Sequence, residues 1–131
     1  MSTKTKVETP QAPRAIGPYS QAVKTDSMIF VSGQLPIDPK TGVMVEGGIM
    51  EKTSKVLDNL EAILKEGGSS LDNVVQVNVY LKNLKADFAQ MNEVYMKRFT
   101  SKVHPARVTV EVSELPLSAP VEISCIATVI N

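Results

Sequence analysis

The chain has 131 residues, which suits a single domain, and 43% of them are hydrophobic, which is enough for a buried core. Fourteen basic residues balance fourteen acidic ones, so the formal net charge is zero, which argues against a nucleic-acid binder or a membrane-surface protein. The one cysteine, Cys125, excludes a disulfide within the chain and fits a reducing compartment.

The N-terminal segment, residues 1–11, lacks the apolar run of a secretion signal, and no segment approaches the roughly 18 apolar residues of a membrane span. Its start is rich in hydroxylic and basic residues without an acidic one, which faintly resembles an organelle-targeting peptide. We expect residues 1–11 to be a flexible tail of one domain that covers residues 1–131. The expected location is the cytoplasm, with the mitochondrial matrix as the alternative.

Two short strands are predicted first, over residues 19–24 and 28–32, with a turn at Thr25–Ser27 between them. The sequence Asp38–Gly42 predicts a tight turn, because Pro39 fixes φ and the final glycine tolerates a positive φ.

Two amphipathic helices follow, separated by a strand. The first helix is predicted over Ile49–Glu66 and ends at Gly67–Gly68, which suit a C-terminal cap. The strand covers residues 75–81, and the second helix runs from Leu84 to near Phe99. The predictions depend on three apolar rows, which are Ile49, Val56, Leu57, Leu60, Ile63 and Leu64, then Val75, Val77, Val79 and Leu81, then Leu84, Phe88, Met91 and Tyr95.

Two β-branched segments, Arg107–Ser113 and Val121–Ile130, close the chain. The order of elements predicts an α+β domain with both helices on one face of a sheet. We expect the last two strands to form a hairpin through residues 113–120. One row of this hairpin is apolar, with Val108, Val110, Val112, Ile123, Cys125, Ala127 and Val129, and the other is mixed, with Arg107, Thr109, Glu122, Ser124, Ile126 and Ile130.

The mixed row needs a cover that the two helices cannot supply, because helices on one face leave the other face open. We expect another copy of the chain to cover Ile126 and Ile130.

Arg107 and Glu122 each allow two interpretations. A guanidinium binds a carboxylate through two parallel hydrogen bonds, which lysine cannot reproduce. Arg107 is therefore either a carboxylate-binding group or a solvated charge at a strand end, which is the commoner case.

Glu122 interrupts an apolar strand, where a carboxylate is costly unless it is paired or hydrated. It either activates water as a general base or forms an ion pair, although the hairpin places it too far from Arg107 for direct contact.

Three further positions are weaker candidates. Tyr19 follows a Gly-Pro turn and either contacts a ligand or packs. Ser32–Gly33 ends a strand, where glycine permits close approach to the backbone, or simply forms a turn. Asn92 lies beside the apolar stripe of the second helix.

One histidine and one cysteine cannot form a zinc site of the usual type within a chain, and we expect no metal.

Six segments follow one another in an order and spacing that resemble a known family. They are Ile16–Val23 (IGPYSQAV), Ile29–Gly42 (IFVSGQLPIDPKTG), Ser69–Leu84 (SSLDNVVQVNVYLKNL), Asp87–Tyr95 (DFAQMNEVY), His104–Pro116 (HPARVTVEVSELP) and Val121–Val129 (VEISCIATV). The resemblance is to the Rid family of reactive intermediate deaminases, and among them to the RidA subgroup.

This resemblance implies a chorismate-mutase-like single domain, with a mixed β-sheet and two helices on one face, that assembles as a homotrimer with sites between subunits. It implies hydrolysis of 2-iminopropanoate and 2-iminobutanoate, the tautomers of reactive enamines such as 2-aminoacrylate, to 2-oxo acids and ammonia. The reaction needs no cofactor and protects pyridoxal-phosphate enzymes from damage.

The family motifs assign roles to residues of this chain. Catalytic roles are implied for Arg107, Glu122 and Tyr19, and substrate-binding roles for Ser32, Gly33, Asn92 and Thr109. The chain departs from the family pattern at His104, where many members have an aromatic residue, and at Thr109, where many have cysteine. The second departure removes a thiol from the site.

Two other functions remain open. The same trimer can be a non-catalytic scaffold that binds small carboxylates. Ribonuclease activity or inhibition of translation is the third candidate, and the neutral charge without a basic stripe argues against it.

Overall fold

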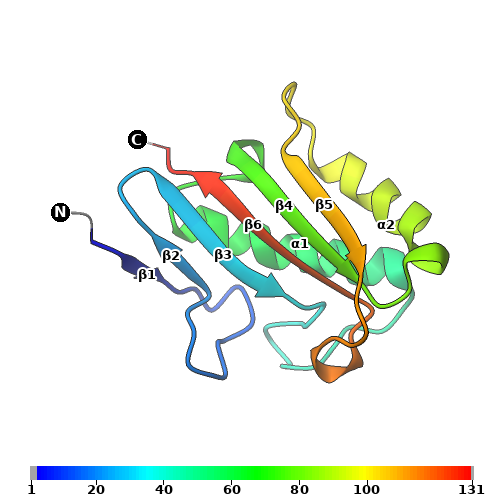
Figure 1. Cartoon of the computed structure of the whole chain (residues 1–131). Coiled ribbons are helices and arrows are strands. Elements are labelled where there is room, and N and C mark those ends of the chain that lie inside the picture. Colours follow the sequence, from blue (N-terminus) through cyan, green and yellow to red (C-terminus); the bar gives the residue numbers. More distant parts are fainter. Residues whose placement is uncertain (1–2, 131) are drawn as a thin grey trace.

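The computed structural model describes residues 3–130, in which two helices cover one face of a six-stranded mixed sheet (Figure 1). This confirms the predicted α+β architecture. The strands are β1 (Thr5–Val7), β2 (Ala22–Lys24), β3 (Met28–Gln34), β4 (Val74–Leu81), β5 (Ala106–Glu111) and β6 (Val121–Thr128), and the helices are α1 (Ile49–Glu66) and α2 (Leu84–Arg98). Two 3₁₀ turns, Leu71–Asn73 and Pro116–Ser118, lie before β4 and β6.

The strand order is β1-β2-β3-β6-β4-β5, so β6 runs through the middle of the sheet. It pairs antiparallel with β3 and β4, whereas β5 pairs parallel with β4 at the edge. The predicted hairpin of the last two strands is therefore wrong. The helix α2 provides the crossover that parallel strands need, and residues 112–120 then carry the chain past β4 to its other side.

The core lies between the two helices and the inner face of the sheet, the face that the helices cover. On β6 this face carries Ile123, Cys125 and Ala127, each at most 2% exposed. The helix α1 has the predicted bounds, and its predicted apolar residues are all buried. Gly67 follows it where any Cβ would collide with the Ile29 side chain. Within the described residues, no helix combines the length and apolarity needed to cross a membrane.

The N-terminal segment is not a flexible tail where the structure describes it, from residue 3 onward. Thr5–Val7 forms an edge strand on β2, and Val7 and Thr9 are buried. Buried Gln21 holds the segment in place: its Oε1 accepts a hydrogen bond from the Thr9 amide at 2.7 Å, and its Nε2 donates to the carbonyl oxygens of Thr9 and Pro13 at 3.0 and 2.8 Å. Composition alone could not reveal a polar side chain that satisfies so many backbone groups.

Two apolar rows differ from their prediction. In β4 the register shifts between Val74 and Gln76, so Val74 is buried and Val75 is exposed. In β5, Val108 and Val110 are 48% and 38% exposed and lie on the outer face, the sheet face that no helix covers. The alternation of these valines was predicted correctly, but they lie on the outer face and not on the predicted face with Ile123 and Cys125.

Candidate active site

Arg107 faces the helices rather than the open side of the sheet. It pairs with Val77 of β4, whose side chain is fully buried under the helices. Its Nη1 donates a hydrogen bond to Asn92 Oδ1 at 2.7 Å, and its Cζ lies 4.6 Å from the ring centre of Tyr95. Among residues 3–130, no carboxylate forms an ion pair with this guanidinium. Arg107 is therefore an oriented cation without a counter-charge.

The position of α2 beside β5 follows from its N-terminal cap. The Asn83 side chain accepts a hydrogen bond from the Ala86 amide at 3.2 Å, and Glu111 of β5 accepts one from the Leu84 amide at 2.9 Å.

Thr109 lies two residues beyond Arg107 on the same face of β5. Its hydroxyl is buried without a hydrogen-bond partner in the described part of the chain. We call Arg107, Asn92 and Thr109 the arginine half-site.

Glu122 occupies the outer face, where it pairs with Tyr80 of β4. Its carboxylate lies over Gly33: a Cβ at position 33 would come within 2.8 Å of Glu122 Cδ. Partial burial raises the pKa of Glu122 above the usual glutamate range. The structure gives this carboxylate no ion pair and no side-chain hydrogen bond within residues 3–130. It can therefore accept a proton from water or from a ligand.

Ser32 precedes the glycine that lies against Glu122, and a hydrogen bond links it to the segment that carries Tyr19. The Ser32 hydroxyl donates to the carbonyl oxygen of Ser20 at 2.7 Å, and the Ser32 amide donates to the Gln21 carbonyl at 2.9 Å. The ring of Tyr19 is 52% exposed, so it is available to a ligand and is not packed in the core. We call Tyr19, Ser32, Gly33 and Glu122 the glutamate half-site.

The two half-sites lie on opposite faces of the sheet. Arg107 shares the inner face with Val77 and Cys125, whereas Glu122 shares the outer face with Tyr80. The prediction that Arg107, Thr109 and Glu122 belong to one row is therefore wrong. A single copy of the chain gathers the residues into two separate groups.

Sequence reasoning missed the aromatic contacts of Arg107. Phe88 and Tyr95 were assigned to the apolar stripe of the second helix, yet their ring centres lie 5.8 and 4.6 Å from the guanidinium carbon. Asn92 stands four residues after Phe88 and three before Tyr95, so the three share one helix face. That spacing was the available signal.

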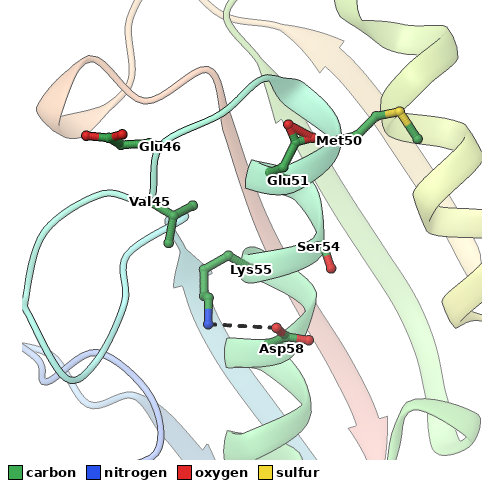
Figure 2. A pocket seen from close by; sticks show the side chains of 7 residues that line it. All are labelled: Val45, Glu46, Met50, Glu51, Ser54, Lys55 and Asp58. Atoms are coloured by element: carbon green, nitrogen blue, oxygen red, sulfur yellow. Dashed lines mark ion pairs between the residues drawn. The ribbon is translucent and has the colours of Figure 1, made fainter.

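Two hollows on the surface of α1 lie away from both half-sites. One, of about 430 Å³, is lined by Val45, Glu46, Met50, Glu51, Ser54, Lys55 and Asp58 (Figure 2). Its lysine Nζ lies 3.8 Å from Asp58 Oδ2, and acidic groups outnumber the basic one, so its charge opposes an anionic ligand. The other, of about 530 Å³, is lined by Thr9, Gln11, Asp58, Glu61, Ala62, Lys65 and Glu66, again with an acidic excess.

Within the described residues, the cysteine is not placed to act as a nucleophile, and acidic, histidine and cysteine side chains do not gather into a metal site. Cys125 is buried in the core, and burial raises the pKa of its thiol to about 12. No group of three histidine, cysteine, aspartate or glutamate side chains within residues 3–130 is arranged to hold a metal ion.

Comparisons with known proteins cover nearly the whole chain. The family model described as Endoribonuclease L-PSP matches residues 9–129. A RutC family protein of Pyrococcus abyssi is 56% identical over 91% of this chain and 92% of its own length. The chloroplastic Reactive Intermediate Deaminase A of Arabidopsis thaliana is 45% identical over 93% of this chain and 64% of its own length. The crystal structure of E. coli TdcF with bound serine is 36% identical and superposes with a TM-score of 0.88, covering 95% of this chain and 98% of that one.

Proposed function

We propose that this chain, which belongs to the endoribonuclease L-PSP or Rid family, hydrolyses small 2-imino acids to 2-oxo acids and ammonia. The substrates we propose are 2-iminopropanoate and 2-iminobutanoate, whose removal limits damage to pyridoxal-phosphate enzymes. The general reaction agrees with the name of the Arabidopsis relative. The observation that carries the proposal concerns two groups that have no ion pair within residues 3–130: the oriented guanidinium of Arg107 and the carboxylate of Glu122, whose pKa is raised.

Arg107 suits the carboxylate that all these substrates share. Asn92 engages one nitrogen of the guanidinium, so an edge with two parallel N–H groups remains for a bidentate contact. TdcF, which was crystallised with serine, binds a small molecule that carries such a carboxylate. The arginine half-site is thus assigned to binding and orientation.

Glu122 suits proton transfer to and from water. As water adds to the C=N carbon, its proton passes to the Glu122 carboxylate, and the imine nitrogen, protonated from solvent, becomes an amine. The resulting amino-alcohol then loses ammonia: the C–N bond breaks, the nitrogen takes the proton from Glu122, and the hydroxyl proton leaves as the C=O bond forms. Acid–base catalysis of this kind contributes about 10²–10⁴-fold.

The two half-sites meet only if different copies supply them, because they lie on opposite faces of one sheet. We propose a homotrimer in which the arginine half-site of one copy faces the glutamate half-site of the next. The outer face supports an interface there, since Phe30, Val108 and Val110 are 44%, 48% and 38% exposed. Glu122 lies on this same face.

The proposed activity is tested with freshly generated 2-iminopropanoate and 2-iminobutanoate. Purified protein should accelerate release of ammonia and 2-oxo acid in a buffer without metal or cofactor. A protein that binds 2-oxo acids but does not accelerate hydrolysis would instead be a carboxylate-binding scaffold. Cleavage of RNA that survives Glu122→Gln would favour the activity that the family description names.

The shared site predicts complementation between two inactive variants. Arg107→Ala and Glu122→Gln subunits should be nearly inactive alone, because every site contains one defect. After unfolding and refolding as an equal mixture, about a quarter of the sites should combine an intact arginine half-site with an intact glutamate half-site. Ammonia release near that fraction of the parent rate is the expected result.

Light scattering coupled to gel filtration gives the mass of the same mixture. A monomer at micromolar concentration, or a trimer whose mixture stays inactive, would contradict a site shared between copies. The parent protein, unfolded and refolded in parallel, controls for losses during refolding.

Gly33→Ala should displace the Glu122 carboxylate without unfolding the protein. The added Cβ would stand 2.8 Å from Glu122 Cδ, and the flexible end of the glutamate can move more easily than the strand. Because a displacement of about 1 Å can cost about 10²-fold in rate, we expect a large loss of kcat with little change in melting temperature. Gly48→Ala is the control, since its Cβ would have no neighbour closer than 3.9 Å. A fully active Gly33→Ala would show that the position of Glu122 is unimportant.

A further inference from the structure

Three side chains on one face of α2 surround the guanidinium of Arg107. Asn92 accepts a hydrogen bond from Nη1 at 2.7 Å, and the ring centres of Tyr95 and Phe88 lie 4.6 and 5.8 Å from Cζ. The helix therefore provides the surroundings of an arginine that belongs to β5.

Among these three, Tyr95 is the one that the core holds in place. It is 7% exposed, whereas Phe88 is 38% exposed. Its ring also packs against Phe99, with 4.5 Å between ring centres. A side chain packed in this way keeps one rotamer, so the guanidinium contacts a ring whose position is fixed.

The hydrogen bond and the ring restrict different movements of Arg107. One hydrogen bond fixes one nitrogen, but the planar group can still turn about that bond. Contact with an aromatic face restricts the plane itself. Within residues 3–130 the guanidinium has no other hydrogen bond, so its Nε and Nη2 hydrogens stay available to a ligand.

We propose that Tyr95 is a positioning residue for carboxylate binding, whose ring sets the plane of the Arg107 guanidinium and so aims its free N–H edge. This inference deepens the proposed function and rests on it. The ring is the part that acts, since the Tyr95 hydroxyl has no hydrogen-bond partner in the described residues.

Two substitutions separate the ring from the hydroxyl. Tyr95→Phe keeps the ring, and Tyr95→Leu removes it but leaves an apolar side chain. Both are titrated with 2-oxobutanoate by NMR, and kcat and KM are measured on 2-iminobutanoate. We expect Tyr95→Leu to raise Kd and KM about three- to thirtyfold, the range of cation–π contacts from exposed to desolvated, with a smaller change in kcat. Tyr95→Phe should keep both constants within about twofold of the parent, since phenylalanine also makes this contact.

The Arg107→Lys background tests whether Tyr95 acts through the guanidinium. Lysine has no plane to orient, so Tyr95→Leu should change Kd much less there than in the parent. Val56→Ala in α1 is the control for lost stability, because Val56 is fully buried in the core and belongs to α1, whereas the described side-chain contacts of Arg107 come from α2. It should lower the melting temperature and leave Kd unchanged.

Several results would overturn the inference. The first is a Kd and KM of Tyr95→Leu that match those of the parent. The others are a rise in Kd as large as that of Tyr95→Leu in Tyr95→Phe or in Val56→Ala. The last is a Tyr95→Leu effect on Kd in the Arg107→Lys background that is as large as in the parent. Absence of ammonia release with retained 2-oxobutanoate binding would refute the proposed hydrolysis alone, and the Kd series would still decide the role of Tyr95. If the parent binds no 2-oxobutanoate, Arg107 is no carboxylate site and this inference falls with it.

Discussion

Replacing Arg107 by alanine is expected to lower kcat/KM on 2-iminopropanoate by about ten- to more than a hundredfold, because a hydrogen bond to a charged group contributes about 1.5–3 kcal/mol. Arg107→Lys should lower kcat/KM nearly as much. It keeps the charge but loses the planar fork that Asn92 and Tyr95 orient. If lysine restores most of the activity, charge alone is what the site requires.

The measurement is kcat/KM for the parent, Arg107→Lys and Arg107→Ala, with the oligomeric mass checked for each. Arg98→Lys is a matched control, because Arg98 lies at the end of α2 and forms ion pairs with Asp58 and Glu61. It changes arginine to lysine outside both half-sites and should stay active. A fully active Arg107→Ala would mean that Arg107 is an ordinary charge and that the arginine half-site is misplaced.

The helices could be predicted from the sequence because each has a strong period of its own. The prediction for α1 matches the structure at both ends, and α2 begins at Leu84 as predicted. An amphipathic stripe and a glycine cap are local signals, so they do not depend on the rest of the fold.

The sheet topology could not be obtained in the same way. Neighbouring strands in the sequence often pair, and that rule suggested a hairpin of β5 and β6. The alternative, a parallel unit of β4, α2 and β5, was compatible with the same elements. The choice depends on where residues 112–120 cross the strand ends, which no local pattern encodes.

For the candidate site too, the sequence indicated which residues take part but not where they lie in the fold. Arginine, glutamate and their neighbours were identifiable from motifs, but their faces were not. Since side chains alternate along a strand, the incorrect pairing of β5 also assigned Arg107 and Glu122 to a common face. The contacts of Tyr95 and Phe88 with Arg107 join α2 to β5 and appear only in the folded chain.

Glu122→Gln is expected to abolish most deaminase activity, since glutamine keeps the shape of the side chain and cannot accept the proton. We expect a loss of about 10²–10⁴-fold in kcat, with binding of 2-oxobutanoate preserved. In the parent, activity should fall on the acidic side as Glu122 becomes protonated, with a midpoint above the usual glutamate range because burial raises its pKa. Any activity that remains in Glu122→Gln should lack this step.

The same substitution should stabilise the protein at neutral pH. A carboxyl group whose pKa is higher in the folded state favours folding when it is protonated, so its stabilising effect is complete below the unfolded pKa and is lost as pH rises through the folded pKa. Above its folded pKa, Glu122 of the parent holds a partly buried charge, which the neutral glutamine removes. Glu122→Gln should therefore melt at a higher temperature than the parent at pH 7, and the difference should shrink as the pH falls through the range in which Glu122 titrates. A variant that is inactive and equally or less stable at pH 7 would indicate that Glu122 is compensated in the assembled protein, whereas parent-like ammonia release would remove its acid–base role.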